Sequence, residues 1–256
     1  MGTLIQQEWY KLTHKLGTWL AIGFMVLVQV AMAVLAAVYP DSPLFNASTL
    51  VENSYIGGDL VMFIAIASVA SIVSMEFQYG TMKQLLYRQY YRSQVFLSKV
   101  VVAVLQFLIL QVIAAAMTVV LSLIGGKYDW FATAKNVPHW QTYALGQAGT
   151  LLMGLLLLSV VLMLSTLFKT NAAAIASGFI GYFVITIAAG ILIALIAKWE
   201  WLKWNPFTFL MTGNQLVTPA LANMTHLTTP VMVVGSLVYT VLFGLIAYAS
   251  FRKRSI

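Results

Sequence analysis

Six long apolar runs, separated by short polar segments, constrain this chain more than any other feature of its sequence. A helix needs about 20 apolar residues to cross about 30 Å of hydrocarbon, and each run is close to that length or longer. They should all be helices, because an open sheet in lipid leaves backbone groups unsatisfied and the alternation typical of barrel strands is absent. The sequence therefore predicts an all-α, polytopic membrane protein. Its six transmembrane helices are expected at about 19–38, 57–75, 96–124, 142–167, 172–197 and 231–250.

Composition supports a membrane protein with one domain. Of the 256 residues, 61% are hydrophobic and only 8% are charged, whereas a soluble domain carries roughly 25% charged residues. The first run is longer than the apolar core of a signal peptide, so it is expected to remain as the first span. With no internal repeat or soluble segment in view, we expect residues 1–256 to form a single transmembrane domain.

The basic residues predict the orientation of the spans. Cytoplasmic loops are enriched in lysine and arginine, and a cytoplasmic N-terminus puts ten of them inside and four outside. Both termini are therefore expected in the cytoplasm. The same rule accounts for the formal net charge of +7, so no nucleic-acid partner is expected. The ten are Lys11, Lys15, Lys83, Arg88, Arg92, Lys99, Lys169, Arg252, Lys253 and Arg254.

Motifs of enzyme chemistry are missing from the sequence. The chain has no cysteine, and its three histidines, His14, His139 and His226, fall in different loops without the H-E-x-x-H spacing of a zinc site. No G-x-S-x-G elbow or G-x-x-x-x-G-K-[ST] loop is present either. We therefore expect no catalytic residue, cofactor site or metal site on this chain.

The polar residues inside the spans are candidates for a translocation path. The deep positions hold amides, Gln29, Gln106 and Gln111, and Asp59 lies at the outer end of the second span. Asp59 could either cap its helix or face an outer vestibule. A proton-coupled carrier usually needs more buried carboxylates than this sequence offers.

Residues 198–230 form the last outer segment, which is long yet only moderately polar. Its centre reads "WNPFTFLMTGNQL", in which Phe207, Leu210 and Met211 recur at helical spacing. This pattern predicts a short interfacial or re-entrant helix before the sixth span rather than a free loop.

The stretch between the second and third spans, residues 74–99, is the most polar and most basic in the chain. Gly80 suits the left-handed position that ends a helix, and Thr81 with Gln84 matches a capping box that starts another. Beyond it, apolar residues lie on one face of the predicted helix and basic residues on another. Such a helix could bind anionic headgroups or dock a cytoplasmic partner. The apolar stripe includes Met82, Leu85 and Leu86, and the basic residues are Lys83, Arg88 and Arg92.

This stretch resembles a family motif. Glu76, the Gly80-Thr81 pair, Lys83 and the Leu85-Leu86 pair resemble the segment between spans two and three of ABC type 2 transporter permeases. The likeness includes the amphipathic N-terminal stretch, the short fourth-to-fifth loop and the long outer segment. It is strongest to the small permeases of bacitracin-resistance and lantibiotic-immunity exporters. One departure is Tyr87-Arg88-Gln89, where many relatives have a proline.

The resemblance implies a transport function without catalysis on this chain. It implies an exporter that moves an antimicrobial peptide or lipid-linked antibiotic outward across a bacterial plasma membrane. An ABC ATPase subunit would carry ATP and Mg²⁺, and a second permease copy or a homologous permease would complete the dimer. The alternatives are an ATP-independent secondary carrier or channel and a membrane-embedded enzyme. The ATPase-coupling residues would be Glu76, Gly80, Thr81, Met82, Lys83, Leu85, Leu86, Arg88 and Arg92.

Overall fold

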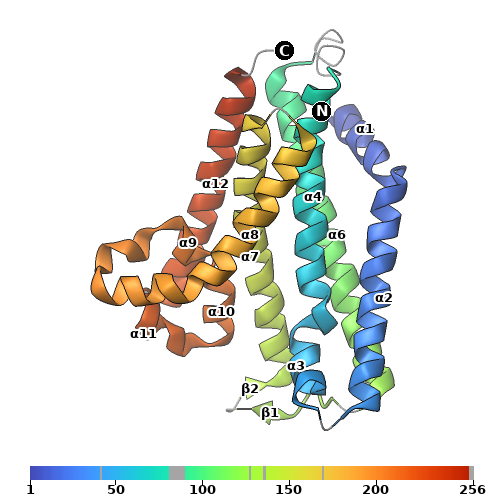
Figure 1. The fold of residues 1–256 in the computed structure, drawn as a ribbon, viewed down its shortest axis with the longest axis vertical. Coiled ribbons are helices and arrows are strands. Elements are labelled where there is room, and N and C mark those ends of the chain that lie inside the picture. Colours follow the sequence, from blue (N-terminus) through green and yellow to red (C-terminus); the bar gives the residue numbers. More distant parts are fainter. Residues whose placement is uncertain (41, 81–89, 127, 135–136, 169, 254–256) are drawn as a thin grey trace.

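The protein is a bundle of long tilted helices, seen here in a computed structural model (Figure 1). The structure describes residues 1–256 except 41, 81–89, 127, 135–136, 169 and 254–256. The described ends of the chain lie at the same end of the bundle, which we call the terminal end. The opposite end is called the distal end. The long helices are α1 (Gly2–Thr13), α2 (Leu16–Val38), α4 (Gly57–Gln78), α6 (Arg92–Gly125), α7 (His139–Leu167), α8 (Asn171–Lys198) and α12 (Thr229–Lys253).

The prediction of an all-α, polytopic membrane protein is confirmed. Among the described residues, five helices are long and apolar enough to cross a membrane, and α8 makes a sixth if its two halves form one span. Those halves, Asn171–Val184 and Thr186–Lys198, meet at an angle of 45°. The six helices cover the six predicted runs with small differences at their ends. Which side of the membrane the terminal end faces stays a prediction.

The long helices pack around α7. It contacts α12, α4 and α8, while α2 lies at the edge of the bundle against α6 and α4 (Figure 1). The outer face of α2 exposes large apolar side chains, including Leu20 and Leu27, each 64% exposed. In water such a surface would be unfavourable, but against lipid it is the expected one.

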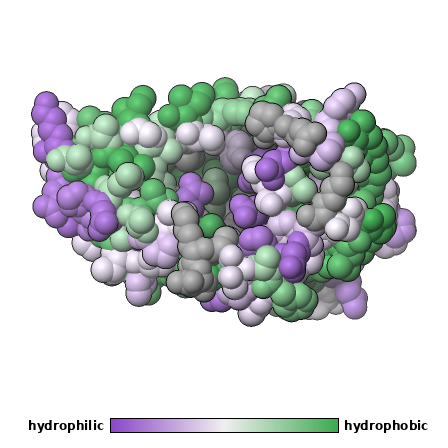
Figure 2. All heavy atoms as spheres, turned by 90° about the horizontal axis from the view of Figure 1, so that it is seen from below, coloured by the Kyte–Doolittle hydropathy of each residue, from purple (hydrophilic) through white to green (hydrophobic). Residues whose placement is uncertain are grey.

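The distal end carries the short elements of residues 39–138 (Figure 1). Figure 2 shows hydrophilic residues gathered in its middle and at one edge, with apolar residues along much of the rim. A polar end with an apolar rim fits a bundle whose sides face hydrocarbon. The short elements that join the long helices within residues 39–138 are η1 (Pro43–Phe45), α3 (Ala47–Glu52), η2 (Ser54–Ile56), β1 (Thr133–Ala134) and β2 (Val137–Pro138).

The segment before α12 is helical in short pieces that pack against α7 and α12. Gly149 and Gly213 bring two backbones together here, since a Cβ on Gly149 would lie 2.5 Å from the Gly213 Cα. Where the helices are interrupted, backbone carbonyls need other hydrogen-bond donors. Gln215 Nε2 supplies one by donating to the Leu227 carbonyl at 2.8 Å. Irregular backbone of this kind is tolerated at membrane depth when it is buried in protein. The pieces are η3 (Glu200–Trp204), α9 (Pro206–Phe209), α10 (Thr212–Val217), η4 (Pro219–Leu221) and α11 (Ala222–Thr225).

The predicted interfacial or re-entrant helix thus corresponds to several short helices. Leu210 and Met211 are buried as an apolar stripe should be, whereas Phe207 is 49% exposed. Pro206 starts α9, a position where its missing N–H costs nothing. Whether the segment re-enters the membrane stays a prediction.

Candidate functional site

Four charged side chains meet at the terminal end and form what we call the charged cluster: Glu8, Lys11, Glu76 and Lys99. Lys99 Nζ lies 3.0 Å from Glu8 Oε2 and 2.8 Å from Glu76 Oε1. Lys11 Nζ lies 2.8 Å from Glu8 Oε1 and 3.1 Å from the same Glu76 oxygen. The charges alternate around a ring, so the cluster joins three helices, α1, α4 and α6, through ion pairs.

Lys99 is the most deeply buried member of the charged cluster. Its side chain has no solvent exposure, and a buried ammonium is costly unless it is paired and hydrogen-bonded. The ammonium has three N–H donors, and three acceptors surround it: the two carboxylates and the Ile72 carbonyl, at 3.1 Å. The full set of partners explains how a lysine can lie inside the bundle.

Helical spacing brings these charges to one place. Leu4, Glu8 and Leu12 are the buried residues of α1, and positions four apart share a helix face. Glu8 therefore sits in the stripe that packs α1 against α6, between two leucines. Glu76 is in the last turn of α4 and Lys99 is in the third turn of α6, so the ion pairs also link the two helices that flank the 81–89 segment.

Electrostatics in the charged cluster favour its charged form. Burial by itself raises the pKa of Glu8, but the nearby charge of Lys99 and the hydrogen bond from Lys11 outweigh burial and lower this pKa. Burial lowers the pKa of Lys11, and its contacts with Glu8 and Glu76 reverse the effect and raise it. Both shifts keep the carboxylate negative and the ammonium positive at neutral pH.

The predicted coupling residues fall partly within the described structure. Glu76 lies in the charged cluster, and Gly80 has a φ of +67°, the left-handed conformation that was predicted for it. Arg92 was predicted in the amphipathic helix between the second and third spans, but it is the first residue of α6, and its Nη1 donates to the Arg252 carbonyl at 2.6 Å. The remaining predicted coupling residues, Thr81, Met82, Lys83, Leu85, Leu86 and Arg88, lie outside the described residues.

The candidate path residues lie in separate places. Gln106 accepts a hydrogen bond from Ser68 at 2.5 Å and lines a cleft beside α4. Asp59 lies in the first turn of α4, yet it makes no capping hydrogen bond and accepts from the Tyr182 hydroxyl at 3.0 Å. Its carboxylate therefore ties α4 to α8.

Gln29 and Gln111 belong to a second polar group, the distal amide network, with Ser54, Tyr143 and Gln147. Gln29 Nε2 donates to the Ser54 carbonyl at 2.9 Å. The Ser54 hydroxyl lies 3.1 Å from the Tyr143 hydroxyl and accepts from Gln147 Nε2 at 2.9 Å. Gln111 donates to Gln147 Oε1. This network joins α2, α6 and α7 to the turn that precedes α4.

That turn is strained. Ser54, Tyr55 and Ile56 have φ angles of +53°, +49° and +66° in succession, which is unfavourable for residues with side chains. Gly57 follows, and a Cβ there would lie 2.3 Å from Gln29 Nε2. The distal amide network therefore holds the start of α4 in a conformation that the backbone alone would not favour.

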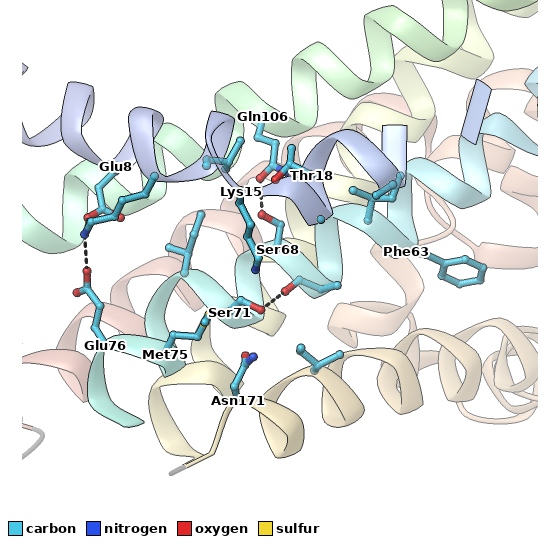
Figure 3. A pocket seen from close by; sticks show the side chains of 18 of the residues that line it. Glu8, Lys15, Thr18, Phe63, Ser68, Ser71, Met75, Glu76, Gln106 and Asn171 are labelled. Atoms are coloured by element: carbon cyan, nitrogen blue, oxygen red, sulfur yellow. Dashed lines mark hydrogen bonds and ion pairs between the residues drawn. The ribbon is translucent and has the colours of Figure 1, made fainter. Parts of the chain in front are cut away.

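A cleft of about 1110 Å³ runs beside the charged cluster (Figure 3). Its walls come from α1, α2 and α4, with contributions from the start of α8 and from Gln106 of α6. Lys15, in the junction between α1 and α2, points into it toward Ser68 and Ser71 (Figure 3). The other end of the cleft is apolar, with Phe24, Leu60, Phe63 and Ile64.

The sequence did not predict that Lys11 and Lys99 would pair with Glu76, or that Glu8 would join them in the charged cluster. Two signals were present: Glu8 interrupts an apolar stripe on α1, and Lys99 lies inside the apolar run at 96–124. A charge at either position needs a buried counter-charge. Among the described residues, no group of three or more His, Asp and Glu side chains could hold a metal ion.

Comparison with known proteins shows the family. The sequence matches the ABC-2 family transporter protein model over residues 4–185. It is also 26% identical to an uncharacterized protein, YhcI, of Bacillus subtilis (strain 168), in an alignment that covers 100% of this chain and 99% of YhcI. The matched region contains α4, α6 and all but the first two residues of α1, and with them the whole charged cluster. The chain therefore belongs to the ABC-2 transporter family and is the transmembrane subunit of an ABC transporter.

Proposed function

We propose that this chain is the permease of an ATP-driven exporter in a bacterial plasma membrane, and that it has no catalytic role of its own. An ABC ATPase partner supplies ATP hydrolysis and holds ATP and Mg²⁺. A second permease, either another copy or a homologous chain, completes the dimer. The cargo is amphipathic or hydrophobic, with an antimicrobial peptide or a lipid-linked antibiotic as the leading candidates, and it moves outward by alternating access.

The observation that carries the proposal is the charged cluster. Its ion pairs tie the end of α4 and the first turns of α6 to α1, and these ends flank the 81–89 segment that is proposed to contact the ATPase. A push on that segment would reach both spans and the N-terminal helix together. Buried ion pairs are stiff links, because separating one exposes an unpaired charge in an apolar surrounding.

Copurification and ATP dependence test the function. The chain is expressed with a candidate ABC ATPase from the same genome and purified in mild detergent, then reconstituted into vesicles loaded with bacitracin or a lantibiotic. The ATPase is expected to copurify, and cargo is expected to leave its starting compartment only when ATP is present. Absence of the ATPase from the purified complex, together with transport that survives ATP depletion, would support a secondary carrier or channel and contradict the proposal.

A further inference from the structure

The cleft beside the charged cluster has an excess of positive charge. Lys11, Lys15 and Glu8 line it together with Glu76, and Lys99 lies behind these carboxylates. Among the described residues, the two carboxylates are already matched by Lys11 and Lys99 in the charged cluster. Lys15 is in none of these ion pairs, so it is the excess cation of the cleft.

Hydrogen-bond donors accompany Lys15 at the polar end of the cleft. Gln106 is buried, and because its Oε1 accepts from Ser68, its NH₂ group is left as a donor. Asn171, at the start of α8, also lines this end and is turned toward the cleft (Figure 3). A free ammonium with amide donors suits an anionic acceptor such as a phosphate.

The apolar part of the cleft suits an alkyl chain. Its lining passes along α4 from Ser71 and Ser68 to Ala67, Ile64 and Leu60, residues that recur every three to four positions and so share one face. Phe24 of α2 closes the apolar end with Phe63. The volume of about 1110 Å³ is slightly above the usual range for ligand sites, so the cleft has room for a headgroup and an alkyl chain.

We infer that this cleft binds a membrane amphiphile with an anionic headgroup. The head meets Lys15 and Gln106, and the alkyl chain lies along α4 against Ile64, Leu60 and Phe63. The ligand enters from the leaflet at the terminal end, where Lys15 stands at the junction of α1 and α2. Binding of the amphiphile in this cleft does not depend on the proposed function. Only the further step, that the bound amphiphile is the exported cargo, rests on that function.

Lipid binding by the chain alone tests the inference. The purified chain is titrated in detergent with phosphatidylglycerol and with chain-matched phosphatidylcholine, and bound lipid is counted by native mass spectrometry. One lysine at a lipid headgroup should give a roughly fivefold preference for the anionic lipid. Lys15→Gln should abolish this preference, while Lys253→Gln, which removes an exposed lysine at the end of α12, should keep it.

A second variant distinguishes lipid bound inside the cleft from lipid bound elsewhere on the protein surface. Ala67→Phe fills the apolar part and should reduce retention of both lipids several-fold without removing Lys15. Equal binding of the two lipids by the unmodified chain would overturn the inference, as would a preference that survives Lys15→Gln or retention that survives Ala67→Phe. If a second copy of the chain covered the cleft, neither lipid would be retained. That result would also contradict the inference. No ATPase is present, so failure of the proposed function leaves this result unaffected.

Discussion

The two ends of the bundle solve the problem of buried polar groups in different ways. At the terminal end the charged cluster uses four ionised side chains, and at the distal end the distal amide network uses neutral amides and hydroxyls. Both connect three or more helices. A neutral network costs less to bury, whereas a charged one resists separation more strongly. The difference indicates a stiff mechanical link at the terminal end and a shape-holding clamp at the distal end.

Loss of Lys99 should have the largest effect on stability. Lys99→Met leaves Glu8 and Glu76 in a buried site, and among the described ion pairs Lys11 is then the one cation that balances both. Breaking a buried pair costs about 3–5 kcal/mol, measured as the free energy of unfolding in detergent. The matched control is Lys203→Met, which removes an exposed pair with Glu200 and should leave stability unchanged.

Restoring the charge balance should recover part of that loss. The double variant Lys99→Met with Glu8→Gln removes one positive and one negative charge and leaves the pair between Lys11 and Glu76. Its free energy of unfolding should lie closer to that of the unmodified chain than to that of Lys99→Met. If the double variant were less stable than the single one by the full cost of Glu8→Gln, the two residues would not be coupled.

The distal amide network can be broken sterically at Gly57. Gly57→Ala places a methyl group against Gln29 Nε2, and overpacking of this kind costs about 1–3 kcal/mol. Gly58→Ala is the matched control, because a Cβ there meets no atom within 4 Å. In thermal unfolding in detergent, the Tm of Gly57→Ala should be lower than that of the unmodified chain. The Tm of Gly58→Ala should be equal to that of the unmodified chain or higher. Equal stability of the two variants would contradict the clamp.

Acid should loosen the charged cluster and spare the distal amide network. Because the folded state lowers the pKa of Glu8, its contribution to stability is present above the ordinary carboxyl pKa. That contribution is lost as pH falls through the lowered value. The chain has no native cysteine, so a spin label at Gln6→Cys on α1 reports the loss as increased mobility when the pH falls well below the ordinary glutamate pKa. A label at Thr49→Cys on α3 should show no such change, and equal responses would contradict the contrast.

The smallest effect is expected from one hydrogen bond in the distal amide network. Gln111→Leu removes the bond to Gln147, and interhelical hydrogen bonds in membranes contribute about 0.6 kcal/mol on average. Val112→Leu, on the exposed neighbouring position, serves as a control for volume. A loss for Gln111→Leu as large as that for Lys99→Met would show that the two ends are held alike.

The sequence predicted the spans well because hydrocarbon thickness sets their length and the apolar runs are unambiguous. The left-handed conformation of Gly80 was predicted from its position at the end of a helix. That prediction depends only on neighbouring residues, so it needs no knowledge of the tertiary packing. The partners of Glu76 were not predicted, because Lys11 and Lys99 lie 65 residues before it and 23 after it. Only packing of α1 and α4 against α6 brings them together, and no local pattern determines that packing.

We propose that the charged cluster transmits the ATPase's movement and that the distal amide network does not. The direct measurement is the amount of cargo exported per ATP hydrolysed, in vesicles that contain the complete complex. Glu76→Gln should keep ATP hydrolysis and lower this ratio roughly tenfold, equivalent to about 1.4 kcal/mol of lost coupling. Gln111→Leu should leave the ratio unchanged. The same ratio in Glu76→Gln as in the unmodified complex would contradict the claim.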